Sequence, residues 1–585
     1  MTGKLHPISI RSVLVLMVFT LIPFVFIAEY VDYFTEAKWV FLYGATGVLL
    51  IVTSLTKKEF IIPRLQTWQI AVVLALVVIF LQNTTRFGWL FQGRVVLDRI
   101  LFCIWAWIFF LKIRETPKFL MYLSYSLLVS AVLVTTIGLL QCSGVVFSFL
   151  PSGYSGNSAS FGHVNYTAEY LAYAIVFFLV FHKDETRFYR RLLFEISTAA
   201  AVAYVIHLNC RAVFLGLIAS LVYLVIFARV LPKLAFVRVC TLSFLLYAAP
   251  TLLQSFRQQI QTVPVVHNPV TSVLAKGTAT IHERFFIWQD LLATTLANPA
   301  GIGPGNFAFG HLLASGKTPH SEIREFFFWH HPHNEFLRFL VEDGWLFTGL
   351  LSILYCSLIW TSWRKYRATQ QGSTEYESLT KKWKLLVSLG LILLTSGGFS
   401  FPLYLPFSFL VAALLTALLF TLQKERLVIK PKFYSKMLLT LVLCIAFLNL
   451  AGRVDLAEYV AKNRLNSEAD TDLACRMLPH HWPVCLAAAQ ANIDHNHFDA
   501  AKAKLDRILQ MFPFHYPALR TQAFLAAQQG NGFDECMSLW AYDAILRNPS
   551  SMTERKNAVC SHEFLQEITR SSLSNNFGTL ARLRR

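Results

Sequence analysis

Charged residues are scarce in this sequence: Asp, Glu, Lys and Arg make up 15% of 585 residues, while hydrophobic residues make up 55%. A soluble domain is closer to a quarter charged. Nearly uncharged runs such as 12–28, 119–140 and 407–422 are about long enough to cross a hydrocarbon core as helices. A soluble bundle is disfavoured because too little polar sequence remains to cover its core. We predict an all-α polytopic membrane protein.

Two other features are missing. No small-residue cleavage site follows the first apolar run, since residues 27–30 read Ile-Ala-Glu-Tyr, so we interpret that run as a retained first helix. No basic face on a soluble domain accounts for the net charge of +18, as nucleic-acid binding would require. We therefore expect a membrane partner and no nucleic acid.

Thirteen apolar segments are predicted as spans, with ends uncertain by a few residues. They cover roughly 12–29, 39–55, 67–83, 97–111, 119–141, 165–181, 192–208, 212–228, 237–254, 344–362, 385–401, 406–423 and 437–452. Because Pro402 and Pro406 interrupt one long apolar region, the bundle is expected to have about 12–13 spans.

Basic residues indicate the orientation. With the N-terminus in the cytoplasm, 26 Lys and Arg residues fall in cytoplasmic segments and five in short outer loops, as the positive-inside rule requires. We predict four parts: membrane spans in 1–254, a large outer loop in 255–343, further spans in 344–452, and an outer helical domain in 453–585.

The tail repeats a short pattern. Trp482-Pro483 recurs as Tyr516-Pro517 at a spacing of 34, and an Ala-rich helical segment follows each pair. This period resembles tetratricopeptide repeats, and an irregular helical domain is the alternative. Either form suits docking, so a protein partner is possible here. Cys475, Cys485, Cys536 and Cys560 permit two disulfides on an oxidising side, in three connectivities.

Histidines are concentrated in residues 330–336, which read His-His-Pro-His-Asn-Glu-Phe. Asn334 opens a helical pattern, so His333 lies where a helix N-terminus favours an anion. The histidines could bind a metal, be structural, or act as a general base. A metal is disfavoured because no cysteine or carboxylate cluster completes a tetrahedron. Imidazole chemistry near neutral pH favours the base.

Arginines are the candidates for anion binding, since guanidinium groups grip phosphate bidentately. Arg211 lies in a tight outer turn between two apolar segments, where it needs an anionic partner. Arg86, Arg94 and Arg99 precede or open the fourth span. They could serve an anion site or extend to the membrane interface.

Three further segments belong to the outer side. Gly162 and Asn165 in residues 161–166 suggest an interruption of regular structure where the chain enters the membrane, and helix capping alone is the alternative. Residues 281–292 read as an amphipathic interfacial helix that carries Arg284 and Trp288. Gly301 and Gly303 indicate a tight turn near a substrate, or a plain loop. They are not a dinucleotide fingerprint, because no strand precedes them.

These residues resemble the O-antigen ligase and polymerase superfamily of membrane glycosyltransferases. The resemblance rests on one large outer loop, on His333-Asn334 followed after nine residues by Gly344, and on Arg284 upstream. Arg211 matches the arginine of a Ser-Arg-Gly-type motif, although Cys210 and Ala212 flank it here. Residues 161–165 resemble a Phe-Gly-Asn-Pro-Asn motif, from which His163 and Val164 depart.

The resemblance implies an inverting, metal-independent transferase with no cofactor. Its donor would be a glycan on undecaprenyl diphosphate, at the periplasmic face of a bacterial inner membrane. Arg211 and Arg284 would hold the diphosphate, aided by Arg86, Arg94 or Arg99, and His333 would take the acceptor's proton. Supporting roles are assigned to these positions: Asn165, Trp288, Gly301, Gly303, His331, Asn334, Glu342 and Gly344.

The acceptor stays open. A ligase would use lipid A–core, a polymerase another lipid-linked glycan, and a protein O-oligosaccharyltransferase a protein hydroxyl. A transporter of lipid-linked glycans would need ionisable residues deep inside several spans, and here they cluster at the outer edge. A non-enzymatic scaffold is the remaining alternative.

Overall fold

The computed structural model describes residues 9–27, 34–56, 60–86, 89–150, 157–230, 232–260, 284–285, 287–289, 291–304, 307, 333–369, 371, 373–423, 426–429, 433–463, 467–477, 482–511, 516–531, 535 and 538–539. Its main helices are α1 (Ile10–Leu21), α2 (Thr35–Thr56), α3 (Thr67–Arg86), α4 (Trp89–Glu115), α5 (Phe119–Cys142), α6 (Val164–Phe181), α7 (Phe188–Leu208), α8 (Arg211–Val222), α9 (Lys233–Ile260), α12 (Glu335–Ala368), α13 (Thr374–Phe399), α14 (Pro406–Leu422), α15 (Phe433–Asn463), α16 (Glu468–Met477), α17 (Trp482–Asp494), α18 (Phe498–Met511) and α19 (Tyr516–Gln528). Two short strands complete it: β1 (Phe60–Pro63) and β2 (Arg426–Ile429).

The prediction of an all-α polytopic membrane protein is confirmed. Each predicted span falls on one of the helices α1–α9 or α12–α15. In the described chain, seven helices are long and apolar enough to cross a membrane, and five shorter apolar helices accompany them. The first predicted span, 12–29, was too long. Helix α1 ends at Leu21 and a 3₁₀ turn with Pro23 follows, because proline cannot continue the hydrogen-bonding ladder.

The core of the bundle lies around α6 and α14. Both helices are hydrophobic on all sides, as expected for fully buried helices, and nearly all of their residues are buried. Phe407 at the start of α14 joins them, since its ring meets Phe19, Tyr170 and Tyr173 at centroid distances of 5.5, 4.7 and 6.2 Å. Pro406 occupies the first turn of α14, where its missing N–H costs nothing.

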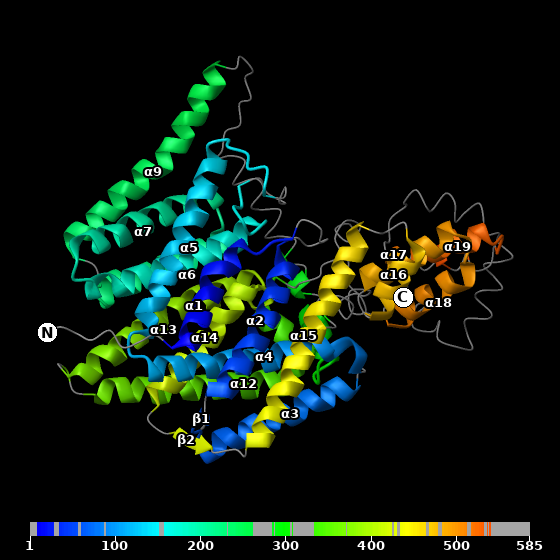
Figure 1. Ribbon diagram of the computed structural model, residues 1–585, viewed down its shortest axis with the longest axis horizontal. Helices are drawn as coiled ribbons and strands as arrows, with labels where there is room; N and C mark the ends of the chain where they lie inside the picture. The colour runs from blue at the N-terminus through cyan, green and yellow to red at the C-terminus, as the bar shows by residue number, and fades with distance from the viewer. Residues whose placement is uncertain are drawn as a thin grey trace.

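Segments predicted on the cytoplasmic side meet one another. Strands β1 and β2 follow α2 and α14 and pair antiparallel, with Phe60 opposite Ile429. Lys381 and Asp184, from two other such segments, form an ion pair at 2.7 Å. Figure 1 shows the two strands at the lower left and α16–α19 beyond the right-hand side of the bundle.

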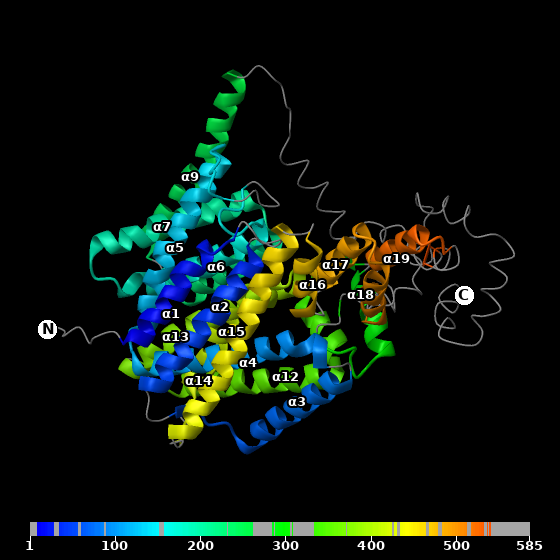
Figure 2. The ribbon, with the colours of Figure 1, turned by 45° about the vertical axis from the view of Figure 1, so that its right-hand side comes forward.

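The tail helices form a separate cluster. Helices α16–α19 bury a core of their own that includes Ala488, Leu505 and Leu525, and Figure 2 shows them set beside the bundle beyond α15. Helices α17 and α19 begin 34 residues apart, at the two predicted aromatic-proline pairs. Cys475 is disulfide-bonded to Cys485.

Candidate functional site

His333 immediately precedes the cap of α12. Asn334 is the N-cap, and its side-chain oxygen accepts a hydrogen bond from the backbone N–H of Leu337 at 3.1 Å. His333 has a φ of 51°, a left-handed conformation in which histidine is enriched among non-glycine residues. Its half-buried ring lies edge-on to Phe401, with centroids 5.1 Å apart. Asn334 therefore starts the helix, while His333 faces the junction between α13 and α14.

Arg284 reaches the same junction. Its Nη1 donates a hydrogen bond to the carbonyl oxygen of Phe399 at 2.9 Å. That carbonyl ends α13, where helix carbonyls lack partners within the helix. Trp288 lies one helical turn along from Arg284, and its ring is 6.0 Å from that of Phe399. Residues far apart in sequence, Arg284 and His333, are thus brought to one short segment, 399–401.

The pKa of His333 is lowered to about 4. Burial of the ring is the main cause, and the positive charges of Arg284 and His163 add to it. Each effect disfavours the imidazolium form. At neutral pH the ring is therefore neutral and has a nitrogen able to accept a proton.

His163 brings the start of α6 to this site. It is the N-cap of α6, and its Nδ1 accepts a hydrogen bond from the backbone N–H of Asn165 at 3.1 Å. Its ring lies 4.7 Å from that of Tyr166, and burial lowers its pKa. The capping alternative for this segment thus holds for His163. The preceding Gly162 has a φ of +73°, and a Cβ there would meet the ring of Phe34 at 1.9 Å.

Arg211 is the first residue of α8, and its side chain is exposed. Asn209 ends α7 in the left-handed conformation, and Cys210 is the N-cap of α8. Burial raises the pKa of the Cys210 thiol to about 12, and the charge of Arg284 acts in the opposite direction. The start of α8 is therefore within electrostatic reach of Arg284.

Arg99 has a different setting. Its Nη2 lies 2.8 Å from both carboxylate oxygens of Asp343, whose side chain is fully buried. The guanidinium lies over the rings of Phe80 and Phe347, at 4.3 and 5.2 Å. Asn83 also donates to the backbone carbonyl of Asp343, at 3.1 Å. Arg99 thus ties α3 and α4 to α12.

Several candidate residues lie outside the description of side chains. Arg86 ends α3 and Arg94 lies within α4, but the structure describes only their backbone. His330 and His331 fall outside the described residues.

Gly301, Gly303 and Gly344, all singled out from the sequence, lie where two backbone segments meet closely. Gly344 interrupts α12 with a φ of 85° and a ψ of 171°. The turn containing Gly301 and Gly303 pairs with this break through three backbone bonds of 2.9 to 3.0 Å. A Cβ on Gly301 would meet the carbonyl oxygen of Glu342 at 2.4 Å, and one on Gly344 would meet the backbone of Ala300 at 2.5 Å. These positions need glycine because two backbones approach closely.

Glu342 stabilises the same backbone contact. Its carbonyl oxygen accepts from the N–H of Gly303 at 2.9 Å, and its carboxylate accepts from the N–H of Phe307 at 3.2 Å. Arg338 lies 3.9 Å from the carboxylate. Glu342 therefore ties α12 to the chain at Gly303 and Phe307.

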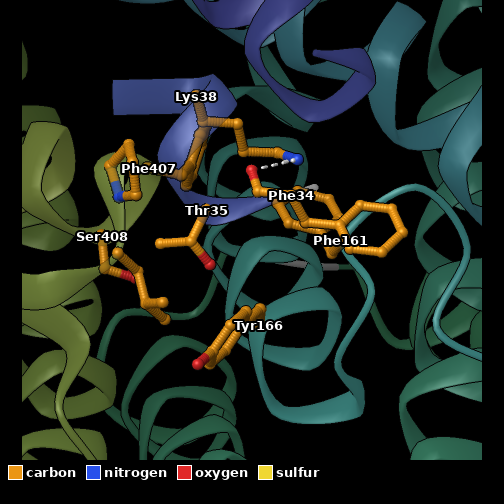
Figure 3. A pocket seen from close by; sticks show the side chains of 9 residues that line it. Phe34, Thr35, Lys38, Phe161, Tyr166, Phe407 and Ser408 are labelled. Atoms are coloured by element: carbon orange, nitrogen blue, oxygen red, sulfur yellow. Dashed lines mark hydrogen bonds between the residues drawn. The ribbon is translucent and has the colours of Figure 1, made fainter. Parts of the chain in front are cut away.

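Lys38 is one of the five Lys and Arg residues that the sequence places in short outer loops. It is buried, and its Nζ donates to the carbonyl oxygens of Val25, Phe34 and Ser160 at 2.8, 3.2 and 3.2 Å. Figure 3 shows Lys38 beside a small cavity, with its hydrogen bond to Phe34 dashed. The cavity measures about 20 Å³, room for about one water molecule. Lys38 thus joins α2 to the loop before α6.

Two buried carboxylates were also missed. Glu335, the first residue of α12, accepts a hydrogen bond from the backbone of Leu403 at 3.0 Å and pairs with Arg338 at 3.1 Å. Glu169 in α6 accepts from the hydroxyl of Ser408 at 2.8 Å. Glu169 could have been found from sequence, because it is the one residue that is charged at neutral pH in the apolar run 164–181.

One comparison with known proteins matches the part of the chain that carries these residues. Residues 196–352 match the family model described as O-Antigen ligase, a segment that contains Arg211, Arg284, His333 and Gly344. No curated protein matches the chain. Multiple apolar helices indicate a multi-pass membrane protein, and the match over residues 196–352 supports the resemblance to the O-antigen ligase superfamily.

Proposed function

We propose that this protein transfers a glycan from undecaprenyl diphosphate to a hydroxyl of lipid A–core. The observation that carries the proposal is the meeting of Arg284 and a neutral His333 on the segment 399–401. A cation beside a neutral imidazole suits the departure of an anionic group together with proton removal from an alcohol.

The proposed roles follow from charge. The acceptor oxygen attacks the anomeric carbon from the face opposite the diphosphate and inverts it. The bond from that carbon to the diphosphate oxygen breaks, and the hydroxyl proton passes to His333. Arg284 and Arg211 stabilise the charge on the leaving diphosphate. This step uses no metal, since guanidinium groups supply the positive charge.

The low pKa of His333 fits this sequence of events. In the free protein the charge of Arg284 helps to keep the ring neutral. A bound diphosphate would offset that charge, so the pKa of His333 would rise toward its ordinary value. The ring would become a stronger base when the donor is in place, nearer the optimum for proton transfer at neutral pH.

We infer that the site faces the periplasm, with the N-terminus and the strands β1 and β2 on the cytoplasmic side of the inner membrane. The excess of Lys and Arg in the segments around these strands supports that orientation. The disulfide between Cys475 and Cys485 supports an oxidising compartment for the tail. The repeat-like tail would bind a protein or the glycan.

The test is a strain that lacks the gene. Its lipopolysaccharide would be resolved on gels and its polyprenyl-linked sugars extracted. We expect long glycans retained on undecaprenyl diphosphate and bare lipid A–core, with recovery by the wild-type gene. Lipid A–core carrying a single repeat would instead identify a polymerase. Unchanged lipopolysaccharide with loss of glycopeptides would identify a protein O-oligosaccharyltransferase.

A further inference from the structure

A basic cavity lies at the opposite end of the bundle from His333. It has a volume of about 380 Å³ and is lined by Arg114, Lys365, Lys381 and Lys382. These residues come from the ends of α4 and α12 and the first turns of α13. The same helix α13 carries Phe399 at the candidate site. The 17 residues from Lys382 to Phe399 separate the two places by roughly 26 Å.

The cavity is formed by helices that pack together. Helix α14 packs against α4, α12 and α13, and α12 also packs against α13. Helices α4, α12 and α14 lie in the lower part of the bundle in Figures 1 and 2. Phe181 at the end of α6 and Leu120 at the start of α5 are buried and close the cavity from the core side. The hydroxyl-bearing residues Thr116 and Ser378 add hydrogen-bond donors to the lining.

The cations exceed the acidic groups that face them. Lys381 is paired with Asp184 at 2.7 Å. Lys382 forms no hydrogen bond or ion pair with the residues that the structure describes, and the charges of Lys365 and Arg114 act on it more strongly than that of Glu375. Like charges around one cavity repel each other, and a bound anion would relieve this repulsion.

Capping of helix C-termini is a simpler explanation for the cations that line this cavity. Four helices end at this cavity, and cations stabilise the partial negative charge of helix C-termini. That role is fulfilled by a lysine that hydrogen-bonds terminal carbonyls, as Lys183 does with the carbonyl of Arg229 at 2.6 Å. Lys382 makes no such bond with the described residues. A cavity within the usual size range of ligand sites also goes beyond what capping requires.

We propose that this cavity binds a phosphate anion, in the form of the headgroup of an anionic glycerophospholipid. Basic pockets between membrane helices on the cytoplasmic side suit such headgroups. The apolar side chains of Ile113, Leu120 and Phe181 provide a surface for the glycerol and the first acyl carbons. A soluble phosphate would use the same cations without that surface. The site is independent of the proposed glycan transfer.

The experiment uses the full-length protein in nanodiscs and compares its binding of a lipid headgroup with its binding of a soluble anion. The probes are phosphatidylglycerol titrated into phosphatidylcholine nanodiscs, and inorganic pyrophosphate added to pure phosphatidylcholine nanodiscs. Thermal unfolding and native mass spectrometry report binding. The test variant is Lys365→Gln with Lys382→Gln. Its matched control is Lys118→Gln with Arg187→Gln, two exposed cations of the same end that do not line the cavity.

We expect phosphatidylglycerol to raise the unfolding temperature of the wild type and of the control. In the test variant its apparent affinity should fall about 25-fold, at roughly fivefold per cation. If the wild type responds only to pyrophosphate and the test variant does not respond, the cavity binds phosphate but its ligand is a soluble anion and not a lipid. Equal responses of wild type and test variant to both probes would overturn the proposal.

Discussion

Two arginines at the end of the bundle that is predicted to face outward show how differently the same side chain can be used. Arg99 pairs with the buried carboxylate of Asp343 and lies over two aromatic rings. Arg284 bonds a backbone carbonyl, and its charge acts on His333. The partner of Arg99 is an anion of the protein itself, whereas Arg284 acts on an imidazole that carries no charge at neutral pH.

The partner of each guanidinium group therefore decides whether that arginine serves the fold or the proposed reaction. Both arginines were candidates for binding a diphosphate, because the sequence places both on the outer side. A buried ion pair fixes helices in one arrangement, and breaking it leaves a charge without compensation. A cation next to a neutral base can instead stabilise charge that develops during a reaction.

The largest expected effect comes from His333→Ala. We expect glycan transfer to fall by about 10²- to 10⁴-fold, because the proton acceptor is lost. The measurement is transfer by purified protein from a polyprenyl-linked glycan to lipid A–core. His495→Ala, an exposed histidine in the tail, should keep wild-type activity. Full activity of a folded His333→Ala protein would contradict the proposed role of His333 as the base.

Asp343→Ala should have the next largest effect, on stability. Removing one partner of a buried pair costs about 3–5 kcal/mol, whereas Arg284→Ala loses a hydrogen bond to a backbone carbonyl, worth about 1.5–3 kcal/mol for a charged donor. Unfolding midpoints in detergent would separate the two variants. Equal midpoints would show that Arg99 and Arg284 are held alike, and the contrast between them would fail.

The smallest effect concerns pH. Because the neutral form of His333 is the base and its pKa in the free protein is about 4, transfer at limiting donor concentration, which reports the free protein, should be constant from pH 8 to 6 and fall as the pH approaches 4. Arg284→Gln removes a positive charge that disfavours the imidazolium, so the pKa of His333 should rise and the fall should begin at higher pH. The residual activity is measured as a pH–rate profile. Lys118→Gln serves as the control for loss of a positive charge elsewhere. If the profile of Arg284→Gln is not shifted, Arg284 does not influence the pKa of His333.

Much of the fold was predictable because hydrophobicity is local information. All thirteen predicted spans correspond to helices, and the prolines at 402 and 406 mark a real boundary between α13 and α14. The aromatic-proline pairs at 482 and 516 begin two tail helices. The end of α1 was missed, although Pro23 was a visible signal for it.

The site was predictable in part. His333, Arg211 and Arg284 were selected from residue type, predicted side and resemblance, and Arg284 and His333 do meet on one segment. Phe401 and Glu335 were not selected, because an aromatic residue and a first-turn carboxylate are common at helix ends. Only their contacts distinguish them.

The membrane class, the helices and the end of the bundle that collects the histidine and arginines could all be predicted from the sequence, because apolar length and charge bias act locally. The tertiary structure alone decided how these groups are partnered. Arg99 meets Asp343 across 244 residues, and the turn at Gly301 closes on the break at Gly344. Such pairings depend on which helices pack together, and no local pattern of residues encodes that choice.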